Sequence, residues 1–152
     1  MSNALSDPRA IALQSAKVGR RKRETLTEKR ARASAITARL ASAYADVECP
    51  LTHQNTFELL VAVMLSAQCT DAAVNKSTPA LFRRYPTPQA LSQAPIADIE
   101  SLIRSLGLFR AKAKSLKRCA EQLVRQFNGE VPSTMEELTT LSGVGRKTAN
   151  VI

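Results

Sequence analysis

The sequence predicts an all-α fold, and three observations carry this prediction. Apolar residues recur at helical spacing along most of the chain, and no stretch alternates apolar and polar residues as a half-buried strand would. The 152-residue chain is 44% hydrophobic but only 4% aromatic, and a composition in which alanine and leucine dominate favours helices over sheets. Prolines, glycines and small polar residues stand where helices would begin and end.

The chain begins with a basic segment, residues 1–23, which shows no periodicity and ends in a run of basic residues at 20–23. We interpret it as a disordered arm that can contact phosphates. A targeting segment is the less favoured alternative, because Asp7 and Pro8 would interrupt an amphipathic helix.

Residues 24–49 form a second segment, in which Ile36, Leu40 and Tyr44 predict one long helix over 26–44. Residues 50–152 form a third segment, and the helix expected at its start is apolar nearly all round and should be buried. Caps and breakers divide this segment into helices at 57–67, 70–85, 87–91, 95–106, 110–127 and 134–141.

The helix at 110–127 is amphipathic and ends at Asn128-Gly129, a typical left-handed cap. Its apolar face consists of Leu116, Ala120, Leu123 and Phe127. The other face is basic and is either a solvated surface or a contact for phosphates. We assign it Arg110, Lys112, Lys114, Lys117, Arg118 and Arg125.

The net charge of +9 predicts a polyanionic partner, with nucleic acid as the first expectation. Residues 1–32 hold nine Lys and Arg against three acids, so much of this charge lies near the N-terminus, where it specifies little. No apolar run is long enough to span a membrane, and no secretory signal is recognisable. Cys49, Cys69 and Cys119 are widely spaced, which predicts reduced thiols in an intracellular protein and no metal site.

Near the C-terminus a short helix, with Ser133 and Glu136 as its expected capping box, leads into Gly143-Val144-Gly145 and a basic helix. A glycine turn lets another backbone come close, and the unpaired N–H groups of the following helix suit one DNA phosphate without reading a base. The alternative is an ordinary connection between two helices with a glycine cap.

Three stretches together resemble the endonuclease III family of helix-hairpin-helix base-excision DNA glycosylases. They are residues 65–71 (LSAQCTD), 107–113 (GLFRAKA) and 143–151 (GVGRKTANV), with 128–132 (NGEVP) between the last two. The resemblance runs from about residue 57 to 152, and more loosely back to the helix at 26–44. Only the hairpin motif is specific by itself.

The resemblance implies a bifunctional DNA glycosylase and AP lyase that excises oxidised pyrimidines from double-stranded DNA. It implies a domain of about six helices, packed beside a second domain that holds a 4Fe-4S cluster and receives the helix of residues 24–49. The family's catalytic aspartate and its four cluster cysteines would follow Ile152, so this chain carries no ligands for the cluster. We therefore expect an N-terminal fragment that is inactive by itself, a view that the uncapped apolar end at Val151-Ile152 also favours.

The resemblance also implies roles for individual residues. Lys147 is the nucleophile, Gln68 enters the gap left by the flipped nucleotide, and Leu108 wedges into the opposite strand. The remaining DNA contacts come from the hairpin, namely Gly143, Val144, Gly145, Arg146 and Thr148. One departure is Ser142, which stands where the family usually has proline.

Each of these roles has a plain alternative. Lys147 could contact a phosphate, Leu108 could pack in the core, and Gln68 could cap a helix. Catalysis by Lys147 requires the neutral amine, and both the positive end of a helix dipole and the charge of Arg146 disfavour a further positive charge there.

Two classes of function remain open from the sequence. The first is the glycosylase and lyase, a monomer in the bacterial cytoplasm or nucleoid with no membrane partner. The second is a non-catalytic DNA-binding module or a monofunctional glycosylase, neither of which needs the amine of Lys147.

Overall fold

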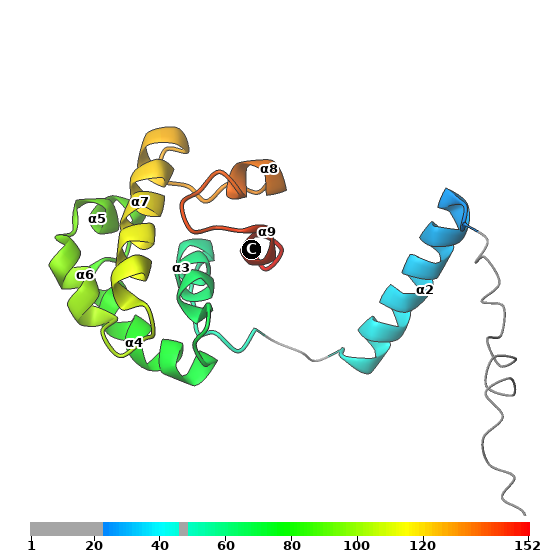
Figure 1. Ribbon diagram of the computed structural model, residues 1–152, viewed down its shortest axis with the longest axis horizontal. Helices are drawn as coiled ribbons and strands as arrows, with labels where there is room; N and C mark the ends of the chain where they lie inside the picture. Colours follow the sequence, from blue (N-terminus) through cyan, green and yellow to red (C-terminus); the bar gives the residue numbers. More distant parts are fainter. Residues whose placement is uncertain (1–22, 46–48) are drawn as a thin grey trace, which may run out of the picture. The chain divides into compact units, whose positions relative to one another are not determined.

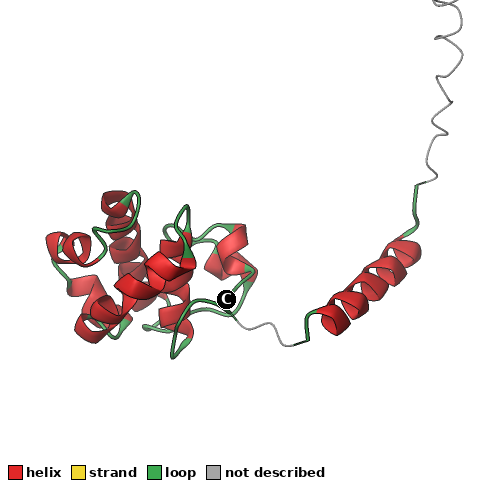
Figure 2. Cartoon of the chain, turned by 90° about the horizontal axis from the view of Figure 1, so that it is seen from below, coloured by secondary structure: helices red, strands yellow, loops and turns green. Residues whose placement is uncertain are grey.

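The computed structural model describes residues 23–45 and 49–152, and every regular element in these residues is a helix (Figure 2). The all-α prediction is therefore confirmed. The chain divides into two units, Met1–Val47 and Glu48–Ile152, which are described separately below. The basic arm expected at residues 1–23 lies outside the described residues except for its last residue.

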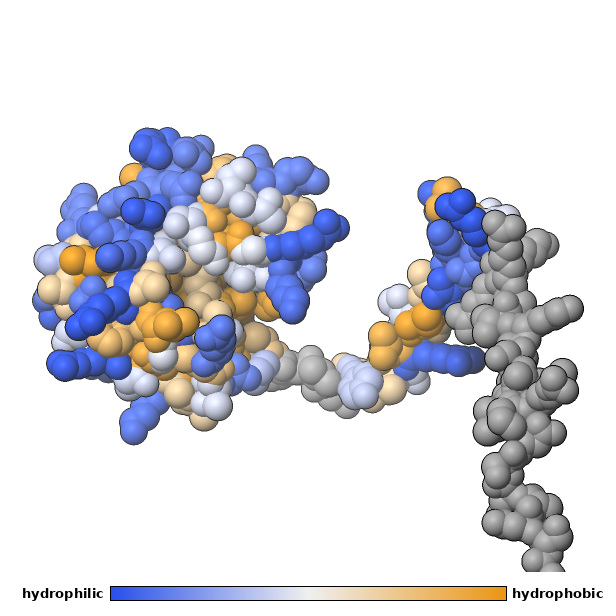
Figure 3. Space-filling model, in the orientation of Figure 1, coloured by the Kyte–Doolittle hydropathy of each residue, from blue (hydrophilic) through white to orange (hydrophobic). Residues whose placement is uncertain are grey.

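The described part of the first unit consists mainly of helix α2 (Leu26–Ala43). The side chain of Thr25 accepts a hydrogen bond from the Glu28 N–H, and Glu28 bonds back to the Thr25 N–H, which completes a capping box. The apolar residues Ile36, Leu40 and Tyr44 are all exposed, and Figure 3 shows apolar atoms on the surface of this helix. The long helix predicted at 26–44 is confirmed.

The second unit carries the remaining described helices (Figure 1). Their order follows the prediction, although α6 and α8 are shorter than expected. They are α3 (Thr56–Ser66), α4 (Asp71–Arg84), α5 (Pro88–Gln93), α6 (Ile96–Leu102), α7 (Phe109–Gln126), α8 (Met135–Leu138) and α9 (Arg146–Ala149).

Helix α3 is the centre of this unit, as its apolar sequence predicts. Leu60, Ala62 and Leu65 are fully buried, and the helix contacts α4, α7 and α9. The side chain of Asn55 accepts a hydrogen bond from the Glu58 N–H and so fixes where α3 begins. Figure 1 shows α7 lying beside α3, with α5 and α6 on the other side of α7.

Helix α7 packs its apolar face into this core and ends as predicted. Leu116, Ala120 and Leu123 are buried. Asn128 and Gly129 both have positive φ, and the Gly129 N–H donates to the Leu123 carbonyl over 2.9 Å. This left-handed cap satisfies a carbonyl that the helix itself leaves unpaired.

The predicted basic face of α7 is wrong at two positions. Lys112 is buried, and Lys117 is half-buried with its ammonium donating to the carbonyls of Ser92 and Ala94 at 2.9 and 2.7 Å. A lysine can lay its long apolar stem over the core while its charge reaches carbonyls that a helix end leaves free. The members of the predicted basic face that are exposed are Arg110, Lys114, Arg118 and Arg125.

Helix α4 runs from Asp71 to Arg84 with Pro79 inside it. One local expectation needs correction. The cap of α8 is Thr134, not Ser133, because the Thr134 side chain accepts from the Glu137 N–H at 3.2 Å and donates to the Glu137 carboxylate at 2.7 Å. The side-chain cap therefore lies one residue later than predicted, and the Glu137 carboxylate accepts its reciprocal bond from the Thr134 hydroxyl.

Candidate nucleic-acid interface

The glycine hairpin between α8 and α9 lies tightly against the core of the second unit. Gly143 has a φ of +80°, and a Cβ at this position would lie 3.0 Å from Met64 Cε and from Ser115 Cβ. Gly143 therefore needs both the left-handed conformation and the missing side chain. Val144 is buried and anchors the turn, whereas a Cβ on Gly145 would meet nothing within 4 Å, which leaves that side of the hairpin open to a partner.

A side chain on α7 braces the backbone of this hairpin. The N–H of Ser142 donates to Oε1 of Gln122 at 2.7 Å, and Nε2 of Gln122 donates to the Thr140 carbonyl at 3.1 Å. Because the amide group bonds the loop on both sides of Leu141, it fixes the path by which the chain enters the turn. This role of Gln122 is not predictable from the sequence, since an amide on a helix face carries no signal of a bond to a loop 20 residues away.

The basic helix after the hairpin presents its first residues to solvent. Gly145 is the N-cap of α9, and its carbonyl accepts a hydrogen bond from the Ala149 N–H at 2.9 Å. Arg146 and Lys147 are exposed, Thr148 is half-buried, and Ala149 is buried and holds the helix to the core. The amine of Lys147 is thus placed where a large partner can reach it.

Gln68 and Leu108 form two tips with the same unusual backbone. Their φ values are 58° and 56°, in the left-handed region that residues other than glycine and asparagine seldom adopt. Gln68 follows Ala67, the C-cap of α3, and Leu108 is the N-cap of α7. Leu108 is 64% exposed and Gln68 is exposed, so neither is a core residue, and the cap of α3 is not Gln68.

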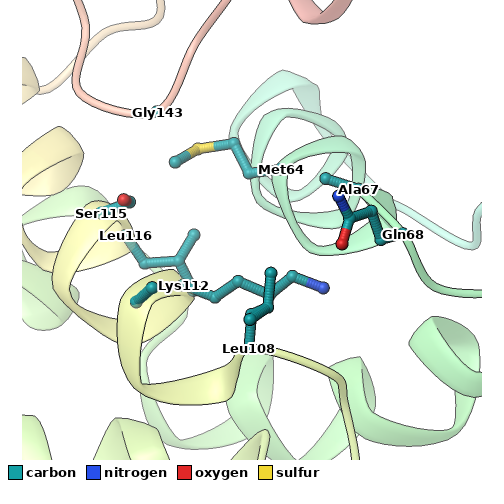
Figure 4. Close-up of a pocket in the computed structure, with 9 residues that line it drawn as sticks. Met64, Ala67, Gln68, Leu108, Lys112, Ser115, Leu116 and Gly143 are labelled. Atoms are coloured by element: carbon teal, nitrogen blue, oxygen red, sulfur yellow. The ribbon is translucent and has the colours of Figure 1, made fainter.

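These two tips and the hairpin meet at one cavity (Figure 4). Its volume is about 220 Å³, and its lining includes Gln68, Leu108, Gly143, Met64 and Lys112. Sites that enclose a small molecule usually measure roughly 300–1,000 Å³. The hollow is therefore better suited to part of a larger partner than to a free metabolite. The structure brings together three sequence motifs that lie up to 75 residues apart, from 68 to 143.

The Lys112 ammonium lies beneath the first tip. It donates to the Leu65 carbonyl at 2.8 Å and to Sγ of Cys69 at 2.9 Å. This donation from Lys112 lowers the pKa of the Cys69 thiol below its usual value, against the opposing effect of burial. Lys112 was predicted on an exposed basic face, because periodicity alone does not show where a long side chain ends.

Helix α7, which contributes to this site, also carries exposed positive charge. Arg110, Lys114, Arg118 and Arg125 are exposed along α7, and Arg110 lies over the ring of Phe109 with its guanidinium carbon 5.3 Å from the ring centre. Figure 3 shows hydrophilic side chains over the part of the molecule that contains α7. Such a surface attracts a phosphate backbone without selecting a sequence.

The described residues do not form a site for the 4Fe-4S cluster that the resemblance implies. Cys49 is exposed, Cys69 is half-buried and Cys119 is buried, and no three cysteine, histidine or acidic side chains in the described ranges converge on a possible metal site. None of the described helices has the length and apolar character needed to cross a membrane.

The sequence is similar to those of known base excision DNA repair proteins. The family model for HhH-GPD superfamily base excision DNA repair proteins matches residues 61–152. The chain is 50% identical over 127 residues to an endonuclease III of Synechocystis sp., covering 84% of this chain and 58% of that protein. It is 45% identical over 114 residues to the endonuclease III of Bacillus subtilis, covering 75% of this chain and 52% of that protein.

A solved structure shares the fold as well as the sequence. It is a trapped endonuclease III–DNA covalent intermediate, an estranged-adenine complex, with a TM-score of 0.71 and 47% identity. The match covers 80% of this chain and 57% of that one. The chain therefore spans about half the length of the relatives that it matches.

Proposed function

Because this chain belongs to the HhH-GPD superfamily of base excision DNA repair proteins, we propose that it is the DNA-binding part of an endonuclease III-type glycosylase and AP lyase. The observation that carries the proposal is that Gln68, Leu108 and the hairpin line one cavity. Helix α9, which carries the exposed amine of Lys147, follows the hairpin directly. A helix connection without function would not need two side-chain tips in the left-handed conformation at the same place.

Binding begins with the duplex backbone. The free N–H groups at the start of α9 and the open side of Gly145 suit one phosphate, while Arg146 supplies charge next to it. Gly143 and the buried Val144 fix the shape of the turn. Both residues and Thr148 complete the set of hairpin residues that contact the duplex. The exposed cations of α7 add contacts that carry no base specificity.

The two tips then act on the base stack. Removing a base from the stack costs a few kcal/mol, and inserted side chains offset part of this cost. Leu108 offers an exposed apolar wedge, and Gln68 offers an amide that can occupy the vacated position and replace lost hydrogen bonds. The left-handed backbone at both residues holds these side chains outward instead of letting them join the core.

Lys147 is the residue for the chemical step. Its neutral amine attacks C1′ of the flipped nucleotide, the C1′–N bond breaks, and the damaged base leaves with the bonding electrons and takes up a proton. Loss of the ring-oxygen bond to C1′ then gives an imine between Lys147 and the opened sugar. Removal of a C2′ proton expels the 3′ phosphate by β-elimination and cuts the strand, and water releases the enzyme.

The resemblance supports oxidised pyrimidines as the substrate bases, and a monomer working on the bacterial nucleoid as the setting. No step of this reaction is assigned to an iron–sulfur cluster, since the described residues provide no site for one. Nothing in the steps above requires a second copy of the chain.

The proposal is tested by joining residues 1–152 to the remaining C-terminal part of the Synechocystis endonuclease III and adding duplex DNA that contains one oxidised pyrimidine. We expect release of that base and cleavage of its strand, with little activity from the 152-residue chain alone. Base release without cleavage would indicate a monofunctional glycosylase. Binding without release would indicate the non-catalytic module and contradict the proposal.

A further inference from the structure

Lys112 is hydrogen-bonded to residues on both sides of the cavity. Its ammonium donates to the Leu65 carbonyl and to Cys69 Sγ, which flank the Gln68 tip. Its backbone N–H donates to the Leu108 carbonyl at 3.0 Å. Figure 4 shows the Lys112 side chain running from α7 toward the end of α3, between the two tips.

The surroundings of Lys112 show that its ammonium has a specific place. The residue is only 9% exposed, and a buried cation is tolerated only where it is paired or hydrogen-bonded. The Leu65 carbonyl lies in the last turn of α3, where the helix leaves acceptors free. The Cys69 sulfur, whose pKa this contact lowers, supplies partial negative charge as the second acceptor.

The backbone around Gln68 needs such support. The Gln68 φ of 58° is unfavourable for a residue with a side chain, and such conformations persist only where neighbouring contacts hold them. The Cys69 N–H donates to the Ser66 carbonyl at 2.9 Å and closes the turn locally. The Lys112 ammonium links this turn to α7, whose N-cap is Leu108. The backbone of Gly107 makes a further contact with the Cys69 sulfur.

We propose that Lys112 is a positioning residue that sets the distance between the Gln68 and Leu108 tips, so that both side chains enter a DNA duplex together. This inference rests on the proposed function for its consequence in DNA, but the bracing itself is a property of the free protein. The competing view is that Lys112 contributes only to the general stability of the fold.

Hydrogen–deuterium exchange on the 152-residue chain separates these two views. In Lys112→Met, which keeps most of the stem and removes the ammonium, amides at 66–70 and 107–109 should exchange about tenfold faster, as expected from loss of a buried charged hydrogen bond. Amides of α5 should be unchanged. Lys114→Met removes an exposed charge from the same helix and should change none of them. Unchanged exchange at both tips in Lys112→Met, or an equal rise in α5, would overturn the proposal.

The reactivity of Cys69 gives an independent reading of the same contact. In a Cys49→Ser background, the remaining cysteines are half-buried Cys69 and buried Cys119. The pH at which Cys69 becomes half-reactive toward iodoacetamide should rise in Lys112→Met, because the hydrogen bond that lowers the pKa of this thiol is lost. Lys112→Arg keeps a donor and should restore most of the lower midpoint. An identical midpoint in Lys112→Met would contradict the contact.

The consequence in DNA is measured with 2-aminopurine opposite an abasic site, at protein concentrations that saturate binding. Lys112→Met should lower the fluorescence gain several-fold while leaving the salt dependence of binding unchanged, because the exposed cations are intact. If hydrogen exchange showed loosened tips in Lys112→Met but the fluorescence gain stayed the same, the spacing of the tips would not matter for base extrusion. If the unmodified chain gave no gain, the proposed function would fail while the exchange experiment still decided the role of Lys112.

Discussion

The side-chain carbonyl of Gln122 accepts a hydrogen bond from the backbone N–H of Ser142 at 2.7 Å. Ser142 stands where the resemblance leads one to expect proline, which has no N–H to donate. A proline would stiffen the entry to the hairpin through its ring. In this protein the same segment is held from outside by Gln122, which also donates to the Thr140 carbonyl.

Replacing Gln122 with leucine should therefore loosen the hairpin. The change leaves the Ser142 N–H and the Thr140 carbonyl without their partner, which costs about 1–3 kcal/mol of unfolding free energy. Affinity for duplex DNA should fall several-fold, because the phosphate-binding turn loses its fixed position. Gln126→Leu, an exposed change on the same helix, is the matched control and should leave both quantities unchanged. If Gln122→Leu bound DNA as tightly as the unmodified chain, the bracing would have no role in binding.

A second prediction concerns the wedge. Leu108→Ala should reduce base extrusion, read from 2-aminopurine fluorescence, by several-fold at saturating protein. Because Leu108 is 64% exposed, the unfolding free energy should change by less than about 0.5 kcal/mol. Val124→Ala removes an exposed apolar side chain from the same helix and should leave extrusion intact. A large loss of stability in Leu108→Ala would return this residue to a role in the core.

A third prediction follows from the charges of α7. Binding to duplex DNA should weaken linearly on a log–log plot of affinity against salt, by about 0.9 for each phosphate neutralised. Arg118→Gln should reduce this slope, because its side chain is exposed. Lys117→Gln should leave the slope unchanged and instead lower stability, because its ammonium is bonded to the Ser92 and Ala94 carbonyls. An equal effect of the two substitutions on the slope would contradict the structure.

A fourth prediction concerns alkaline pH. Burial raises the pKa of the Cys119 thiol to about 12, whereas an unfolded thiol titrates near about 8.5. The stabilisation is therefore complete below the unfolded pKa and is lost as pH rises toward the folded pKa, at about 1.4 kcal/mol per pH unit. Urea denaturation between about pH 8.5 and 11 should show this slope. Cys119→Ala should remove that contribution, and an unaltered slope would contradict the burial of the thiol.

The sequence predicted the helices well where a local signal defines them. The apolar run at 57–67 predicted α3, and Asn128-Gly129 predicted the end of α7. The hairpin and the two loops that carry Gln68 and Leu108 could be recognised because their motifs are short and continuous. The bonds of Lys112 and Gln122 could not be predicted, because they reach backbone groups between 20 and 47 residues away. Periodicity reports which face of a helix a residue lies on and does not report the end point of a long polar side chain.

The central claim, that Lys147 forms a Schiff base, is tested most directly by borohydride trapping. Borohydride reduces an imine to a stable amine, so it crosslinks protein to a duplex that contains an oxidised pyrimidine. In the fusion to the C-terminal part of the Synechocystis relative, we expect a crosslink for the unmodified sequence and for Lys114→Gln, an exposed lysine on α7. Lys147→Gln should give none while still binding the duplex. Full crosslinking by Lys147→Gln would contradict the assignment and point to another amine.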